Sequence, residues 1–370
     1  MMFYFPEFKA FCQAEDISHT LHNLYTLRGA KVRNGQKWSE YIDLALQKWG
    51  DDVQVTFGSH HWPSWGNQNI KGYWESQRDI YRFIHDQTLR LANEGYTPVE
   101  IANMIKLPPS LDKKFYNRGY YGSVSHNVKA QYDLYFGWFD GNPANLDKLP
   151  PAEAGKKYVE FMGGANNVLS QARKSFDKGE YRWVAEVVNH VVFADPKNKA
   201  ARDLLADAYE QLGYQAESGP WRNFYLSGAK ELREGVKVLP APNTAGSDMV
   251  RGMSPELFFN FLAMRFKGTE PAAAAMKYNF NITLPDVNQQ VALIVENGTV
   301  TPRIGSHVKD NVTATLTINR SDLDRISLGE AKLHDLISKG DIKIDGDRNA
   351  FNSFLGMVDQ FNFWFNIVEP

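Results

Sequence analysis

The spacing of apolar residues changes twice along this 370-residue chain and divides it into three parts. Residues 1–66 mix strand and helix patterns, and residues 67–237 are spaced almost throughout as amphipathic helices. Residues 250–370 return to strands with helices between them. We therefore predict a multidomain protein with an α/β segment, an all-α domain and an α+β domain. A run rich in Pro, Gly and Asn at 239–247 predicts the boundary before the last domain.

Several local patterns are specific enough to test. Apolar spacing predicts helices near residues 17–27 and 37–49, and alternation predicts a strand at 52–57. Thr97, followed by Pro98 and Glu100, is typical of a capping box. Asn297-Gly298 between two strand patterns predicts a tight hairpin.

The composition excludes some partners. The formal net charge is -2 and no basic stripe stands out, so nucleic-acid binding has no electrostatic support. The apolar runs are far shorter than a membrane span requires. Cys12 is the only cysteine, which excludes an internal disulfide and an all-cysteine metal site.

Two histidines follow the strand predicted at 52–57. A side chain just past a strand end is held in direction yet stays accessible, which suits a metal ligand. Because adjacent residues of an extended segment point to opposite sides, we expect only one of His60 and His61 to bind an ion. The alternative is that both are ordinary loop histidines. His19 and His22 are spaced to share a helix face, but no second pair completes a site.

Two further features point to chemistry on an oxyanion. Arg28 and Arg33, near Asn23, would place two guanidinium forks beside this potential metal site, and such forks match sulfate or phosphate. The alternative is two exposed surface arginines. His126 lies where a loop rich in Gly and Tyr leads into a helix. It could donate a proton to a leaving oxygen, or it could be a buried structural histidine.

The chain resembles a known family, the zinc-dependent alkyl sulfatases of the metallo-β-lactamase superfamily. Three segments carry the resemblance, in matching order and spacing. They are residues 11–33, with Ala14-Glu15-Asp16 and Leu27-Arg28-Gly29-Ala30; Ser59-His60-His61-Trp62-Pro63; and residues 118–143, with Arg118-Gly119-Tyr120-Tyr121-Gly122 and His126-Asn127.

The resemblance implies a role for each candidate. Glu15 would be a bridging carboxylate and His60 the last histidine ligand of a two-zinc site. Asn23, Arg28 and Arg33 would bind sulfate, and His126 would face the active site as a catalytic residue. Such enzymes hydrolyse primary alkyl sulfates, dodecyl sulfate among them, to an alcohol and inorganic sulfate, with a zinc-bound water or hydroxide as nucleophile or base.

The resemblance also implies three domains. Residues 1–66 would be the C-terminal remnant of a metallo-β-lactamase-like hydrolase domain, and 67–237 a helical dimerisation domain that forms a homodimer. Residues 250–370 would be a domain of the sterol-carrier-protein type 2 kind that holds the alkyl tail.

The chain departs from the family in one respect. The family's Thr-His-x-His-x-Asp-His motif and a further glutamate ligand have no match, so only two of the expected zinc ligands are present. We expect the chain alone to lack activity, as part of a longer enzyme. The alternative is a non-catalytic module for dimerisation and for binding lipid or surfactant. Some members of the family are periplasmic or secreted, and the sequence does not indicate a compartment.

Overall fold

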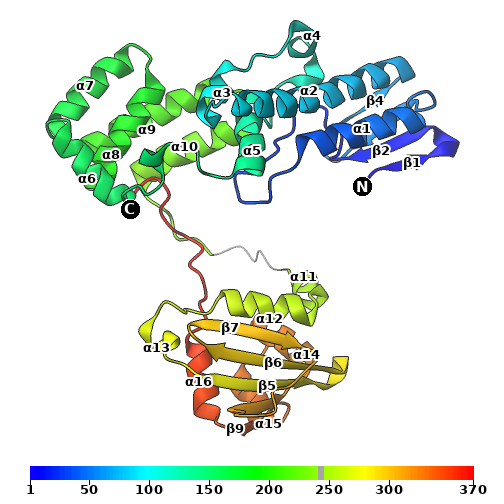
Figure 1. Ribbon diagram of the computed structural model, residues 1–370, viewed down its shortest axis with the longest axis vertical. Helices are drawn as coiled ribbons and strands as arrows, with labels where there is room; N and C mark the ends of the chain where they lie inside the picture. The colour runs from blue at the N-terminus through cyan, green and yellow to red at the C-terminus, as the bar shows by residue number, and fades with distance from the viewer. Residues whose placement is uncertain (241–245) are drawn as a thin grey trace. The chain divides into compact units, whose positions relative to one another are not determined.

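The chain forms two units in the computed structural model, which describes residues 1–240 and 246–370. Unit 1 comprises Met1–Val236 with Asn366–Pro370, and unit 2 comprises Lys237–Phe365 (Figure 1). The predicted boundary run at 239–247 lies partly outside the described residues. Unit 1 has two hydrophobic cores, and unit 2 has one core of its own.

Unit 1 begins with a mixed four-stranded sheet in the order β1-β2-β3-β4. Its strands are β1 (Phe3–Phe5), β2 (Ala10–Ala14), β3 (Val55–Gly58) and β4 (His61–Trp65). Strands β2 and β3 are parallel, and the other pairs are antiparallel. Helices α1 (Gly35–Trp49) and α2 (Asn67–Asn93) pack against the sheet, and Phe11 meets Trp74 with ring centroids 4.8 Å apart (Figure 1).

The helix predicted at residues 17–27 does not form, so that prediction is wrong. The apolar residues that suggested it, Ile17, Leu21 and Leu24, are fully buried, but they lie in a segment without regular structure. The backbone there bonds to side chains and loops from other parts of unit 1 instead of to its own residues four positions away. Tertiary partners have overridden the local helical spacing. We refer to residues 20–34 as the 20–34 loop.

The rest of unit 1 is helical, as its periodicity predicted. The helices are α3 (Pro98–Met104), α4 (Pro109–Asp112), α5 (Val124–Phe136), α6 (Pro151–Phe161), α7 (Ala165–Asp177), α8 (Tyr181–Ala194), α9 (Lys199–Gln215) and α10 (Gly219–Glu234). The capping box at α3 is confirmed, because Thr97 and Glu100 each bond the other's backbone N–H. A second core lies among α7 to α10.

Unit 2 is a mixed five-stranded sheet in the order β7-β6-β5-β8-β9 with helices packed on it. Its strands are β5 (Tyr278–Leu284), β6 (Gln289–Glu296), β7 (Thr299–Ile304), β8 (Ala314–Thr317) and β9 (Lys343–Gly346). Its helices are α11 (Ser247–Gly252), α12 (Pro255–Met264), α13 (Pro271–Ala274), α14 (Arg320–Ser327), α15 (Leu333–Lys339) and α16 (Arg348–Gly356) (Figure 1). The predicted hairpin is confirmed, with positive φ at both Asn297 and Gly298.

The C-terminal tail, Asn366–Pro370, returns to unit 1 after unit 2 is complete. The Glu231 carboxylate on α10 accepts hydrogen bonds from the backbone N–H groups of Ile367 (2.7 Å) and Val368 (3.0 Å). Glu369 forms an ion pair with Arg202 in which both side chains are mostly buried. Within unit 2, the Trp364 indole donates to the Leu239 carbonyl at 2.7 Å and brings the two ends of that unit together.

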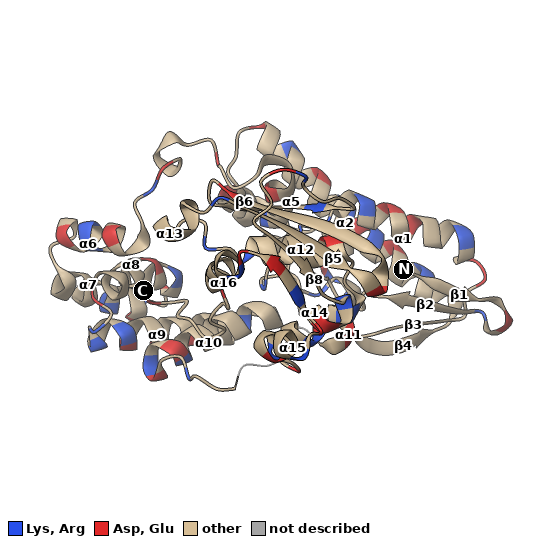
Figure 2. Ribbon diagram, turned by 90° about the horizontal axis from the view of Figure 1, so that it is seen from below, with Lys and Arg blue, Asp and Glu red and all other residues tan. Residues whose placement is uncertain are grey.

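Charges of both signs are interspersed along the exposed helix faces (Figure 2). Ion pairs such as Lys37–Glu40 and Arg78–Asp43 account for part of this pattern. In the part of the chain that the structure describes, no helix combines the length and apolarity that crossing a bilayer requires.

Candidate functional site

The parallel pairing of β2 and β3 brings two of the predicted residues together. Both strands end at the same edge of the sheet, where Glu15 follows β2 and His60 follows β3. The His60 Nε2 atom contacts the Glu15 Oε1 atom, and both side chains remain partly exposed. The hydrogen bond from His60 holds the pKa of the Glu15 carboxyl below its usual value. A carboxylate and an imidazole therefore lie at one edge of the sheet, although they are 45 positions apart in the sequence.

A cavity of about 660 Å³ opens beside this pair. Its lining combines the predicted acid, histidines and arginines with hydroxyl and aromatic side chains. The lining residues are Glu15, Ser18, His19, Thr20, His22, Arg28, Arg33, His60, His61, Trp62, Phe115 and Tyr121. We call this the Glu15 cavity. Two arginines outnumber its single carboxylate, so it suits an anion.

The two arginines differ in how they are held. Arg33 uses one guanidinium nitrogen on the Asn23 carbonyl (3.2 Å), the Asn23 side-chain oxygen (3.4 Å) and the Thr26 hydroxyl (3.2 Å). Its guanidinium also lies 5.9 Å from the centroid of the Trp38 ring. Arg28 is exposed and makes no hydrogen bond or ion pair with any described residue. Asn23 is buried behind Arg33 and does not line the cavity.

The other histidines of the cavity are tied to protein groups. His22 is buried, and its Nδ1 donates to the Asn23 carbonyl at 2.8 Å. The His19 ring lies tilted beside the His61 ring, with centroids 4.8 Å apart, and its Nε2 meets the Ser64 hydroxyl at 3.1 Å. Burial lowers the pKa of both His19 and His22, so the two rings favour the neutral form.

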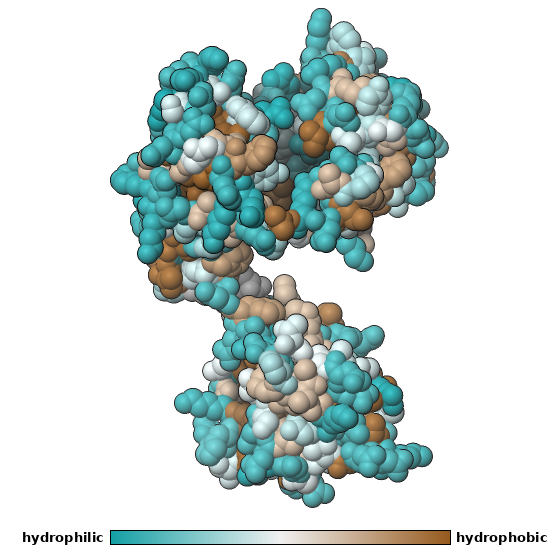
Figure 3. Space-filling model, turned by 60° about the vertical axis from the view of Figure 1, so that its left-hand side comes forward, coloured by the Kyte–Doolittle hydropathy of each residue, from teal (hydrophilic) through white to brown (hydrophobic). Residues whose placement is uncertain are grey.

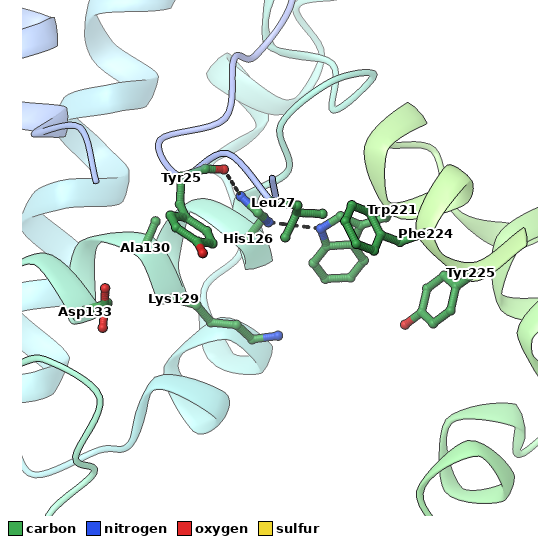
Figure 4. Close-up of a pocket in the computed structure, with 9 residues that line it drawn as sticks. All are labelled: Tyr25, Leu27, His126, Lys129, Ala130, Asp133, Trp221, Phe224 and Tyr225. Atoms are coloured by element: carbon green, nitrogen blue, oxygen red, sulfur yellow. Dashed lines mark hydrogen bonds between the residues drawn. The ribbon is translucent and has the colours of Figure 1, made fainter. Parts of the chain in front are cut away.

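His126 does not line the Glu15 cavity. It lines a separate cavity of about 580 Å³ with Tyr25, Lys129 and Trp221, between α5 and α10 (Figure 4). Its Nε2 donates to the Tyr25 carbonyl at 2.6 Å, and its Nδ1 accepts from the Trp221 indole at 3.0 Å. Both ring nitrogens of His126 thus already have hydrogen-bond partners. The role of proton donor stays a prediction, and this geometry does not favour it.

Some lining residues had no role in the sequence prediction. Tyr121 and Phe115 belong to this group, although Tyr121 lies in the Arg118–Gly122 motif that carried the family resemblance. The signal for Tyr121 was the glycine that follows it, Gly122. Gly122 packs directly on the backbone of His22 and Asn23, where a side chain has no room. A glycine at a position with no room for a side chain is a signal that the motif closely approaches another segment.

The two side chains at the sheet edge, Glu15 and His60, are of types that bind zinc. Imidazole nitrogen and carboxylate oxygen are both zinc ligands, and Glu15 and His60 already touch. Within residues 1–240 and 246–370, no group of three or more His, Cys, Asp and Glu side chains is placed to hold an ion. A catalytic zinc needs about three protein ligands, so Glu15 and His60 would supply only part of such a set.

Comparison with known proteins assigns the family. Residues 97–235 match the family described as alkyl sulfatase dimerisation, and residues 243–370 match alkyl sulfatase C-terminal. A linear primary-alkylsulfatase from a Pseudomonas strain is 32% identical over 369 residues, which cover 97% of this chain and 69% of the relative. The chain belongs to the alkylsulfatase family.

More specifically, it corresponds to the C-terminal portion of these proteins. A linear primary-alkylsulfatase of Pseudomonas sp is 55% identical over the whole chain, which spans 54% of that relative. An (R)-specific secondary-alkylsulfatase of Pseudomonas sp is 46% identical, again over the whole chain and 55% of the relative. The solved structure of a stereoselective inverting sec-alkylsulfatase from Pseudomonas sp. superposes with a TM-score of 0.94 at 44% identity, covering 100% of this chain and 58% of that one.

The packing of Gly122 yields a test of the site's construction. A Cβ at this position would lie 2.5 Å from the His22 carbonyl oxygen and 2.7 Å from the Asn23 backbone nitrogen. We expect Gly122→Ala to displace the 20–34 loop and to lower the free energy of unfolding of unit 1 by about 1–3 kcal/mol. Thermal denaturation followed by circular dichroism measures the loss.

Gly72→Ala is the matched control. Nothing lies within 4 Å of a Cβ at Gly72, in the middle of α2. Alanine favours helix over glycine by about 1 kcal/mol, so this change should be neutral or stabilising. Equal stability of the two variants would contradict the packing described for Gly122.

Proposed function

We propose that the chain supplies the sulfate-binding half of a zinc-dependent hydrolase of primary alkyl sulfates, which are cleaved to alcohol and inorganic sulfate. The observation that carries the proposal is that Glu15, His60, Arg28 and Arg33 line one cavity, although they come from separate segments. Family membership supports it, and so does the likeness to two linear primary-alkylsulfatases. The sheet of unit 1 would then be the remnant of a metallo-β-lactamase-like domain.

The arginines provide the recognition. A sulfate ester presents three oxygens that share negative charge, and a guanidinium offers parallel N–H donors to two of them. Arg28 has all its donors available, whereas Arg33 has committed one nitrogen to Asn23 and Thr26 and keeps the others. A fixed Arg33 and an adaptable Arg28 would bind the head group from two directions.

Glu15 and His60 would hold zinc at the edge of this anion site. When bound, zinc would supply a Lewis acid and lower the pKa of a coordinated water. The chain's own residues then hold the ester next to it. His19 and His22, which burial keeps in the neutral form, add hydrogen-bonding groups to the cavity but no charge.

Replacing Arg28 tests this proposal. We expect an enzyme in which this chain is joined to the N-terminal half of the 55% identical relative to release sulfate from dodecyl sulfate when zinc is present. Arg28→Lys should lower kcat/KM about 10- to 100-fold, because an ammonium cannot reproduce the planar fork. Sulfate release and bound zinc are measured in the same samples.

Arg78→Lys is the control, since Arg78 pairs with Asp43 and Asp79 away from the cavity. It should retain nearly full turnover. Turnover of Arg28→Lys equal to that of the parent would remove Arg28 from the site, and a joined enzyme that binds no zinc would contradict the assigned ligands.

A homodimer is the second part of the proposal, and the match to alkyl sulfatase dimerisation supports it. Apolar side chains reach the surface at several places (Figure 3). In the matched region, Phe161 is 91% exposed beside Tyr158 and Leu149, at a groove of about 1000 Å³. Several exposed apolar side chains gathered at one groove are typical of a surface that another chain covers.

We therefore expect Phe161→Asp to weaken dimerisation, because pairing would bury an uncompensated charge. Sedimentation equilibrium gives the mass of the particle. Val287→Asp, at an exposed apolar position of unit 2, should leave the dimer intact. A parent chain that sediments as a monomer, or two variants that behave alike, would refute the assignment of this surface.

A second candidate function, binding of a surfactant or lipid chain by unit 2, is favoured by one observation. A cavity of about 610 Å³ lies between the sheet and the helices of unit 2, and nearly all its lining is aliphatic or aromatic. Arg265 is its one charged residue, and its Nε donates to the Asp359 carbonyl at 2.6 Å. An apolar chamber with one guanidinium suits an alkyl chain with an anionic head, as in a sterol-carrier-like domain.

Filling this cavity should abolish such binding. Leu323 lines it and is half-buried, so Leu323→Trp is expected to weaken dodecyl sulfate binding by at least about tenfold, measured by calorimetry below the micelle concentration. Leu257→Trp, at a position on α12 that is 56% exposed, is the control. Equal affinities for the parent and both variants would place surfactant binding elsewhere.

A further inference from the structure

We infer that Asn127 and Gln131, together with His126, are positioning residues that hold the 20–34 loop in the shape that binds the sulfate group. The inference rests on the proposed function of the Glu15 cavity. The loop carries Arg28 and Arg33 but has no helix or strand to hold its backbone. The three side chains project from α5, a helix of the region that matches alkyl sulfatase dimerisation.

Asn127 holds the beginning of the loop through both ends of its amide. Its side-chain nitrogen donates to the His22 carbonyl at 2.9 Å, and its side-chain oxygen accepts from the Leu24 N–H at 2.8 Å. These groups flank Asn23, the residue that binds the Arg33 guanidinium. Asn127 is fully buried, so no water can replace either bond without opening the structure.

Gln131 does the same at the end of the loop. Its side-chain nitrogen donates to the Arg33 carbonyl at 2.9 Å, and its oxygen accepts from the Gly35 N–H at 2.8 Å. It is also fully buried. The two amides lie four residues apart and therefore on the same face of α5. Together they fix the backbone on either side of the contact between Asn23 and Arg33.

His126 adds a third anchor between the other two. Its Nε2 donates to the Tyr25 carbonyl, and the Trp221 indole on α10 holds the opposite ring nitrogen (Figure 4). Since a carbonyl only accepts and an indole N–H only donates, the ring is neutral with its proton on Nε2. Burial lowers the pKa of His126 in the same direction. His126 thus connects α10 to the loop and acts through the loop on the arginines.

Only a side chain with a donor and an acceptor can make the paired bonds of Asn127 and Gln131. Neutral substitutions remove both bonds and leave the charge near the arginines unchanged. A change in that charge would by itself alter the affinity for an anion. Gln131→Met conserves length, and Gln131→Asn keeps the amide but is one methylene too short. Gln171→Met, at an exposed position of α7, is the matched control.

The experiment is a calorimetric titration of the full chain with inorganic sulfate in chloride buffer, well below the unfolding temperature. We expect Gln131→Met to weaken sulfate binding about tenfold, which is the effect of losing roughly one good hydrogen bond at the site. Gln131→Asn should weaken it less while unfolding at nearly the parent temperature, and Gln171→Met should bind like the parent. Asn127→Leu should behave like Gln131→Met.

A double-mutant cycle separates positioning from general destabilisation. If Gln131 acts through Arg33, Arg33→Ala should cost far less affinity in the Gln131→Met background than in the parent. Additive losses would overturn the positioning role. Parent-like sulfate affinity in both Gln131 variants would overturn the inference and leave the proposed function intact. A parent chain that binds no sulfate would overturn the proposed function and this inference with it.

Discussion

The site depends on one constraint, that buried backbone groups need hydrogen-bond partners. The 20–34 loop is buried from Leu21 to Leu24 and at Thr26 but lacks regular structure, so bonds within the loop, such as that from the Arg33 N–H to the Leu24 carbonyl, satisfy only some of its N–H and C=O groups. Side chains from distant helices supply the partners, among them the Tyr81 hydroxyl, which accepts from the His22 N–H at 3.0 Å. The packing of α2 and α5 against the loop therefore determines its conformation, and with it the placement of both arginines.

This dependence explains which features the sequence could predict. Patterns that rest on near neighbours were correct, such as the capping box at Thr97 and the hairpin at Asn297, because their partners lie within a few residues. The helix at 17–27 was wrong because the spacing of Ile17, Leu21 and Leu24 reports burial, and burial alone does not require a helix. The partners of that segment lie 59 to 105 positions away, beyond the reach of any periodicity.

The candidate site was predictable to a similar degree. The family resemblance identified Glu15, His60, Arg28 and Arg33, and the structure brings these four to one cavity. It places Asn23 outside the lining of that cavity and His126 in a separate cavity, and each of the two holds another group. Sequence reasoning could name His126 as chemically capable, but it could not show that both ring nitrogens are already bonded. The spacing of Asn127 and Gln131 on one face of α5 was a signal of their shared role that residue type alone did not reveal.

The C-terminal tail has a consequence for folding thermodynamics. Its contacts with Glu231 and Arg202 close a loop that contains all of unit 2. While unit 2 is unfolded, that loop is long and flexible, whereas the folded unit joins its own ends through Trp364 and Leu239. Closure entropy grows with the logarithm of length, so a roughly tenfold shorter effective loop makes docking easier by about 2 kcal/mol. Folding of unit 2 and docking of the tail are thus cooperative, and unfolding of either weakens the other.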